Sequence, residues 1–572
     1  MRNLKIRFGF RFEAFSAALA ALGLYLGLAF FAPGGPLSSD VMWYINAGMN
    51  QIKDTFILNR YFHVFMQAIF VELAPSPLVG HQHFWAFLIS AICLLIYLSA
   101  RNFSRQSGPL HGLFGVAIFL SIKALSETTG IALVDISAML MVSIITLVYL
   151  LSLKQEHRSA WLIGLLGLLF FLAFKTKETT LIAGLLVFGL GYGPQPGFQF
   201  SQLLKRLPSF ALGALLGLVF FMLLSGIFLG DLFFGMRPAE IRAFALTYVQ
   251  GAADAPPLPG SDTWYNGYFF SVLLFPFVLY LLSGARCALD ERLGGGQRLV
   301  WLLPLALILF VSLTIGNQWG FLPRFIFPSL PLIAMLGPQF LELKFPSQPK
   351  NFLLSLGGLA LLLAALVGLH LALRTNLLER GQDIGVFLAT ILNPIFLTLI
   401  LGMSFFKQRL NLGLSLIVLT LSLGILSAPL GSNLREMLQH QSNAHQTQRL
   451  FHPFAAFAED IAYEEDMRFY ASQNVWVEMG ITQFGKDSNE VASLFNLYFD
   501  ARSNKDQYTL STDPLQILAQ AQTADYSYIL LSSLDWQTFT AQPATQTQWL
   551  EKYQTILDPL HGLVLLKYNN LP

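Results

Sequence analysis

Long apolar segments recur through the first 430 residues of the chain, and they constrain its fold more than any other feature. A helix of about 20 apolar residues crosses the hydrocarbon core of a bilayer. Charged residues form only 12% of the chain, against about 25% in soluble domains, so an ordinary soluble fold is excluded. We expect thirteen spans, near residues 14–31, 84–100, 108–122, 134–153, 160–174, 179–193, 208–229, 268–284, 299–316, 325–341, 352–373, 386–406 and 411–429. Residues 1–430 are therefore predicted to form an all-α polytopic membrane domain.

Basic residues indicate how this domain sits in the membrane. Lys and Arg are enriched in the short cytoplasmic loops of membrane proteins. With the N-terminus in the cytoplasm, the inner segments hold 17 basic and five acidic residues, whereas the outer segments before residue 430 hold 10 basic and 12 acidic residues. We therefore expect a multi-pass protein of the cell (inner) membrane, with a cytoplasmic N-terminus and an extracytoplasmic C-terminus.

The last part of the chain, residues 431–572, has a different composition. It holds 8 basic and 16 acidic residues and no long apolar run. The stretches "MRFYASQNVWV", "YSYILLSS" and "HGLVLLKYNN" are typical of strands, and "TDPLQILAQAQ" and "TQTQWLEKYQTIL" have helical periodicity. These patterns predict a small extracytoplasmic α/β domain. Its loosely spaced histidines do not indicate a metal site.

The first outer loop, residues 32–83, contains the stretch "GGPLSSDVMWYINAG". Asp40, Tyr44 and Ala47 would share one face of a helix. Asp40 is either the N-cap of that helix or a functional carboxylate. Residues 60–73 form a second amphipathic stretch, which is too short and polar to span the membrane and is expected at its outer interface.

Further charges lie at the predicted outer ends of spans, where charged groups usually face a cavity or a partner. Each also has a structural explanation, because it could snorkel to the interface or form an ion pair with a neighbour, as Lys177 could with Glu178. Together they predict an outward-facing polar cavity. They are Lys123, Glu127, Asp135, Lys175, Lys177, Glu178 and Arg324.

In its pattern of motifs the chain resembles the GT-C superfamily of membrane glycosyltransferases, in particular its protein mannosyltransferase and aminoarabinose transferase branch. The resemblance covers roughly residues 10–345 and rests on the order of several short motifs. The chain departs from the family pattern at Val41, where an acidic residue is usual, and in "RYFH", which lacks a lysine and a proline. The motifs are "SSDVMWYINAGM", "NRYFHVF", "LVDISAMLM", "FKTKETTL" and "PRFIFPSLPLIAML".

The resemblance implies transfer of a sugar from a polyprenyl-phosphate carrier to an acceptor hydroxyl, with inversion. It assigns Asp40 as the general base that takes the acceptor proton, and Asp135 as a second acidic residue near the pocket. Fixed cations would stabilise the departing phosphate. Tyr44 would line the pocket, unless it is only a packed interfacial aromatic. The remaining substrate-binding candidates are Arg60, Lys177 and Arg324, then Lys175 and His63, with Glu178 beside them.

Several alternatives stay open at this stage. The outer loop 230–267 either gates or binds substrate, or is a disordered connector. No ligand spacing requires a metal, and we expect no cofactor, although Asp254 and Asp262 could join a divalent cation with Asp40. The expected partners are the lipid bilayer, the donor and an acceptor that is a lipid, glycan or protein, with no nucleic acid. A transporter or flippase and a non-catalytic lipid-binding relative are the competing functions.

Overall fold

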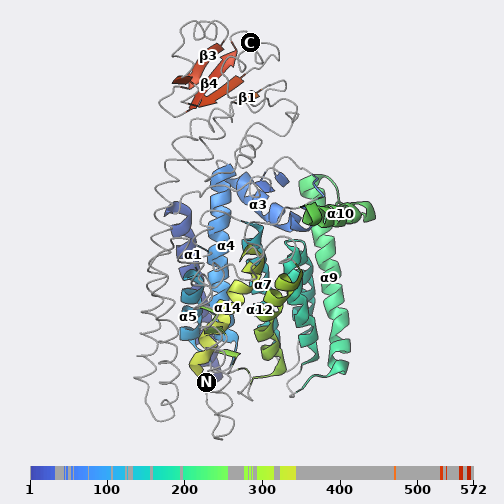
Figure 1. The fold of residues 1–572 in the computed structure, drawn as a ribbon. Helices are drawn as coiled ribbons and strands as arrows, with labels where there is room; N and C mark the ends of the chain where they lie inside the picture. The colour runs from blue at the N-terminus through green and yellow to red at the C-terminus, as the bar shows by residue number, and fades with distance from the viewer. Residues whose placement is uncertain are drawn as a thin grey trace, which may run out of the picture.

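In the computed structural model, the described helices between residues 2 and 342 form a bundle, and a small sheet lies near the C-terminus (Figure 1). The structure describes residues 2–31, 44–48 and 53–342 with gaps, the largest at 126–132, 255–275 and 315–322, and the strands between 469 and 568. The long helices are α1 (Arg2–Phe31), α4 (Pro77–Asn102), α5 (Pro109–Leu120), α7 (Val134–Leu153), α8 (Ala160–Phe174), α9 (Phe200–Leu229) and α12 (Gly295–Thr314).

Four of these helices are long and apolar enough to cross a membrane: Glu13–Phe30, Val79–Asn102, Val134–Leu153 and Phe200–Leu229. They coincide with four expected spans, and shorter apolar helices occupy five others. The expected spans at 352–373, 386–406 and 411–429, and most of 268–284, lie outside the described residues. The count of thirteen therefore stays a prediction.

Two expected spans have an irregular backbone. The span expected near 325–341 consists of three short pieces, η3 (Pro323–Ser329), α14 (Leu330–Leu336) and η4 (Gly337–Glu342). Prolines within these pieces remove backbone donors and prevent one continuous α-helix. The span expected near 179–193 is a 3-10 helix, η2 (Glu178–Gly191), in which every third residue is buried, at Thr180, Ala183, Leu186 and Gly189.

Glycines bring α8 and α9 unusually close together. A Cβ atom added at Gly167 would lie 1.9 Å from the Phe210 carbonyl oxygen, and one at Gly213 would lie 1.7 Å from the Gly164 carbonyl oxygen. No larger side chain fits at either position without separating the helices. The opposite side of α9 carries exposed apolar side chains, as expected of a surface that faces lipid.

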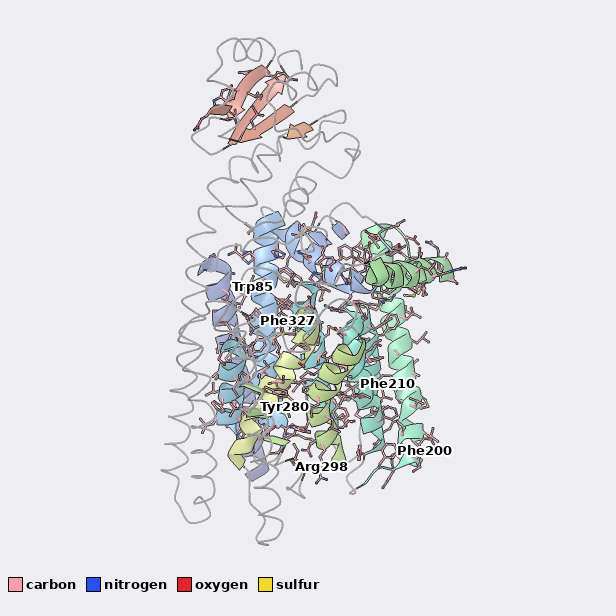
Figure 2. The ribbon with its side chains drawn as sticks, viewed as in Figure 1. Trp85, Phe200, Phe210, Tyr280, Arg298 and Phe327 are labelled. Atoms are coloured by element: carbon pink, nitrogen blue, oxygen red, sulfur yellow. The ribbon has the colours of Figure 1, made fainter. Side chains whose placement is uncertain are left out.

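The core of the bundle is apolar, and Figure 2 labels several of its members. Trp85 and Tyr280 are fully buried and Phe327 is almost so, whereas Phe200 at the start of α9 is exposed. The helices α4 and α7 finish at the same end of the bundle where α9 begins (Figure 1). There Arg101 pairs with Glu13, and Lys154 donates a hydrogen bond to the Asn102 side chain. These basic residues belong to the loops that were expected to be cytoplasmic.

Short helices lie at the other end of the bundle (Figure 1). η1 (Leu58–Arg60) leads directly into α3 (Tyr61–Leu73), and α10 (Pro238–Asp254) follows the turn after α9. Residues 238–254 of the loop expected at 230–267 are therefore helical, and residues 255–267 lie outside the described residues. Pro238 at the first helical position and Glu240 in the first turn favour this helix, and Glu240 accepts hydrogen bonds from the amides of Gly235 and Arg237.

The C-terminal sheet has the order β1-β2-β4-β3. β1 (Phe469–Ala471) pairs in parallel with β2 (Tyr528–Ser532), and β4 (Leu563–Tyr568) pairs antiparallel with both β2 and β3 (Tyr553–Leu557). Three of these strands fall in the stretches expected to be strands. The prediction of a helix through residue 557 is wrong at its end, because residues 553–557 form the edge strand beside β4. The helical part of the expected α/β domain otherwise lies outside the described residues.

Candidate functional site

A buried ion pair is at the centre of the candidate site. The Lys177 ammonium donates a hydrogen bond to the Asp135 carboxylate, and both side chains are almost fully buried. Asp135 lies in the first turn of α7, and Lys177 ends the tight turn that follows α8. The sequence left open an ion pair between Lys177 and Glu178. In the structure Lys177 pairs with Asp135 instead, and Glu178 lies 4.0 Å from Arg60.

Arg60 connects this turn with the first outer loop. Its Nη1 atom donates a 2.6 Å hydrogen bond to the Tyr44 hydroxyl, and its Nη2 atom lies 4.0 Å from the Glu178 carboxylate. The other oxygen of Glu178, Oε2, is buried without a hydrogen-bond partner among the described residues. Tyr44 is itself buried. The guanidinium is therefore held between a phenol and a carboxylate from distant parts of the sequence.

His63 adds a neutral polar group to the cluster. Its Nδ1 atom lies 2.8 Å from the Ser137 hydroxyl, and its ring meets Tyr44 edge-on, with centroids 5.1 Å apart. Burial, together with the nearby positive charges of Arg60 and Lys177, lowers the pKa of His63 to about 3. The His63 imidazole is therefore uncharged at neutral pH and adds no positive charge to the cluster.

Lys175 lies on the other side of the same turn. Its buried Nζ atom donates a 3.3 Å hydrogen bond to the Gly235 carbonyl and sits 5.1 Å from the centre of the Phe221 ring. Burial lowers the pKa of Lys175 to about 8, although the Glu240 carboxylate opposes this. The Lys175 carbonyl accepts a hydrogen bond from the backbone of Phe62, so α3 is fastened to the lysine turn.

The structure thus brings most of the predicted site residues together from four segments of the chain. Two members of the predicted set are not placed in it. Asp40 lies outside the described residues, and for Arg324 the structure describes the backbone in η3 but not the side chain. The residues joined by contacts are Tyr44, Arg60, His63, Asp135, Lys177 and Glu178, with Lys175 beside them.

Several polar residues of this region were not predicted. Ser137 holds His63, and the pair Gln67 and His81, with 2.8 Å between side-chain nitrogens, extends the buried polar groups between α3 and α4. The only sequence signal was the spacing of His63 and Gln67, which are four residues apart and so lie on one face of α3. That face is buried, and its polar groups must find partners there.

No group of three or more metal-ligating side chains lies together in the part of the chain that the structure describes. The "HQH" motif at 81–83 is not a paired ligand set, because His81 bonds Gln67 and His83 bonds the Tyr25 hydroxyl. The acidic residue Asp262 lies outside the described residues.

Comparisons with known proteins give a likeness of structure. No family model matches the sequence, and no curated protein matches it. The chain is similar to a crystal structure of ArnT from Cupriavidus metallidurans bound to undecaprenyl phosphate, with 14% identity, a TM-score of 0.51 and coverage of 96% of this chain and 97% of that one.

Two further solved structures resemble the chain. One is ArnT from the same organism in the apo state, with 14% identity, coverage of 98% of both chains and a TM-score of 0.47. The other is an Archaeoglobus fulgidus oligosaccharyltransferase tethered with an acceptor peptide, with 12% identity, coverage of 98% and 74% and a TM-score of 0.42. The likeness to the lipid-bound ArnT structure shows that the present chain shares its fold over nearly the whole length of both proteins.

Proposed function

We propose that this chain, which has the fold of the GT-C membrane glycosyltransferases, moves a sugar from a polyprenyl-phosphate carrier to an acceptor hydroxyl on the outer face of the membrane. The observation that supports this proposal best is the cluster of Arg60, Lys177 and Asp135 at one end of an apolar helical bundle. Charged groups are costly near lipid and are usually retained for function. The likeness to a structure that holds undecaprenyl phosphate supports the class of donor.

The proposed chemistry needs few groups. A phosphate is already a good leaving group, so the acid that protonates the leaving oxygen in ordinary glycoside hydrolysis is not required. One base must take the proton of the acceptor hydroxyl, and we assign this role to Asp40, which is ionised at neutral pH if its pKa is near the ordinary value of about 3.9. Direct attack by the acceptor inverts the anomeric carbon.

Positive charge stabilises the phosphate as it departs. The candidates are Arg60, Lys175, Lys177 and Arg324. Arg60 is suited to a bidentate contact with phosphate oxygens, because its guanidinium presents parallel N–H donors. Asp135 is assigned a positioning role, since it holds the Lys177 ammonium in place. We further propose that transfer needs no metal, so activity should survive treatment with a chelator.

We propose an inner-membrane location, with the candidate site on the extracytoplasmic side. Arg101 and Lys154 lie at the opposite end of the bundle, in connections that the positive-inside rule assigns to the cytoplasm. The C-terminal sheet lies beyond the end that carries α3 and α10 (Figure 1). We expect this sheet to orient the acceptor, which is a lipid, a glycan or a protein.

The test is transfer by the purified protein from radiolabelled polyprenyl-phosphate sugars to membrane acceptors. We expect Asp40→Asn to lower the rate by roughly 10²-fold or more, in line with the contribution of a general base. Asp254→Asn, a matched change at the end of α10, should leave transfer unchanged. Equal rates for wild type and Asp40→Asn would remove the base assignment. Absence of transfer with every donor would favour a flippase or a lipid-binding protein.

A further inference from the structure

The cations at the α3 end of the bundle differ in whether a carboxylate neutralises them. Lys177 is paired with Asp135, and Arg60 is 4.0 Å from Glu178. The two more exposed cations in this region share one acidic partner, since Lys53 lies 3.6 Å and Arg237 2.8 Å from Asp231. Within the described residues, the buried ammonium of Lys175 has no carboxylate within ion-pair distance.

The carboxylate whose charge acts on Lys175, that of Glu240, already has hydrogen-bond partners. Glu240 accepts a 2.7 Å hydrogen bond from the Gly235 amide and a 2.8 Å hydrogen bond from Arg237 Nη1. Lys175 itself contacts the Gly235 carbonyl and the faces of Phe174 and Phe221. An ammonium has three N–H donors, so the single carbonyl leaves two of them for another acceptor.

The Lys175 amine lies close to the backbone of Gly235. Gly235 has a positive φ of 78°, and a Cβ atom added there would lie 3.5 Å from Lys175 Nζ and 3.2 Å from Leu58 Cδ1. The hydrogen bond from Phe62 to the Lys175 carbonyl holds the lysine turn next to the segment that carries Arg60. Lys175 is thus fixed beside the candidate site.

A buried cation is unfavourable unless an anion accompanies it. We propose that Lys175 is the lysine that receives the phosphate of the lipid-linked donor, and that Lys177 acts as a positioning residue through its ion pair with Asp135. This inference rests on the proposed function and distinguishes its two candidate lysines, leaving the role of Arg60 unchanged. The chemistry recognised is a phosphate oxyanion, which a polyprenyl phosphate or free phosphate could supply.

Binding of undecaprenyl phosphate to the full chain in lipid nanodiscs tests the inference. Three Lys→Met variants should be compared with wild type, at Lys175, Lys177 and the exposed Lys53. We expect Lys175→Met to weaken binding at least tenfold, Lys175→Arg to restore part of the loss, and Lys53→Met to have no effect. Binding of uncharged undecaprenol should be the same in wild type and Lys175→Met. Lys175→Gln is the second variant if Lys175→Met does not fold.

The outcomes separate this inference from the proposed function. Wild-type affinity in folded Lys175→Met or Lys175→Gln would overturn the inference while leaving the donor class intact. Failure of wild type to bind undecaprenyl phosphate would instead overturn the donor class, and the inference with it. A Lys175-dependent effect of inorganic phosphate, without one of undecaprenyl phosphate, would identify a site for a free anion and overturn the lipid assignment.

Discussion

Lys177 and Asp135, 42 positions apart in the chain, form a buried ion pair that joins the turn after α8 to the first turn of α7. Removing one member leaves an uncompensated charge in the interior, which typically costs about 3–5 kcal/mol. We expect Lys177→Met to lower the free energy of unfolding by this amount in a denaturant titration. Lys177→Met combined with Asp135→Leu should cost less than Lys177→Met alone.

The exposed pair of Lys53 and Asp231 provides the control for that experiment. Lys53 is 44% exposed, so Lys53→Met should change the free energy of unfolding by less than about 1 kcal/mol. If Lys177→Met is as mild as Lys53→Met, the buried pair does not stabilise the fold as argued.

The stability of the ligand-free protein should depend on pH through Lys175. Burial lowers its pKa from 10.5 to about 8 in the folded state. Between these two values the unfolded chain binds a proton that the folded protein does not, so the free energy of unfolding rises with pH, by at most about 1.4 kcal/mol per pH unit. We expect wild type to gain stability relative to Lys175→Met between pH 8 and pH 10 in thermal unfolding. Parallel curves would show that Lys175 titrates normally.

Tyr44→Phe should loosen Arg60. The substitution keeps the buried ring and removes the hydroxyl that accepts the 2.6 Å hydrogen bond from Arg60. Hydrogen bonds to charged groups contribute about 1.5–3 kcal/mol, so we expect the Kd for undecaprenyl phosphate to rise roughly tenfold or more. Tyr25→Phe removes a hydroxyl that bonds His83 instead and is the matched control. Equal affinities for the two variants would exclude a role for Tyr44 in holding Arg60.

Gly213→Ala should separate α8 from α9. The added Cβ atom would lie 1.7 Å from the Gly164 carbonyl oxygen. Overpacking of this kind typically lowers the free energy of unfolding by about 1–3 kcal/mol. Gly23→Ala in α1 has no atom within 4 Å of the new Cβ and should be neutral or slightly stabilising, because alanine favours a helix. Unfolding of the two variants in the same detergent compares them directly. A stable Gly213→Ala protein would mean that the close approach is dispensable.

The described side chains that the sequence singled out lie close together, but the ion pair between Lys177 and Glu178 that was considered for them is not the one formed. Hydropathy fixes where a span ends, and so it correctly put Asp135 and Lys177 at the ends of neighbouring spans. It did not single out their partnership, because Asp135 could have oriented any nearby Lys or Arg, and Lys177 with Glu178 was an alternative ion pair. Lys177 has an extended backbone, with φ −166° and ψ 139°, and consecutive side chains on an extended chain point in opposite directions.

Local patterns failed where tertiary contacts or an overlooked helix signal decided the structure. Residues 553–557 continue a helical periodicity, yet they pair with β4 as an edge strand, since pairing depends on a segment that follows them in the chain. Residues 238–254 were read as part of the outer loop 230–267 because they lie between two expected spans. Pro238 followed by Glu240 was the helix-start signal in that stretch.

The 3-10 geometry of η2 has a consequence for its reach. A 3-10 helix rises about 2.0 Å per residue, against about 1.5 Å for an α-helix. The 14 residues of Glu178–Gly191 therefore extend about 28 Å, whereas an α-helix of equal length would extend about 21 Å. The hydrocarbon core of a bilayer is about 30 Å thick. In a bilayer, this segment would reach nearly across the hydrocarbon core, which an α-helix of the same 14 residues would not, while its first residue stays next to the lysine turn.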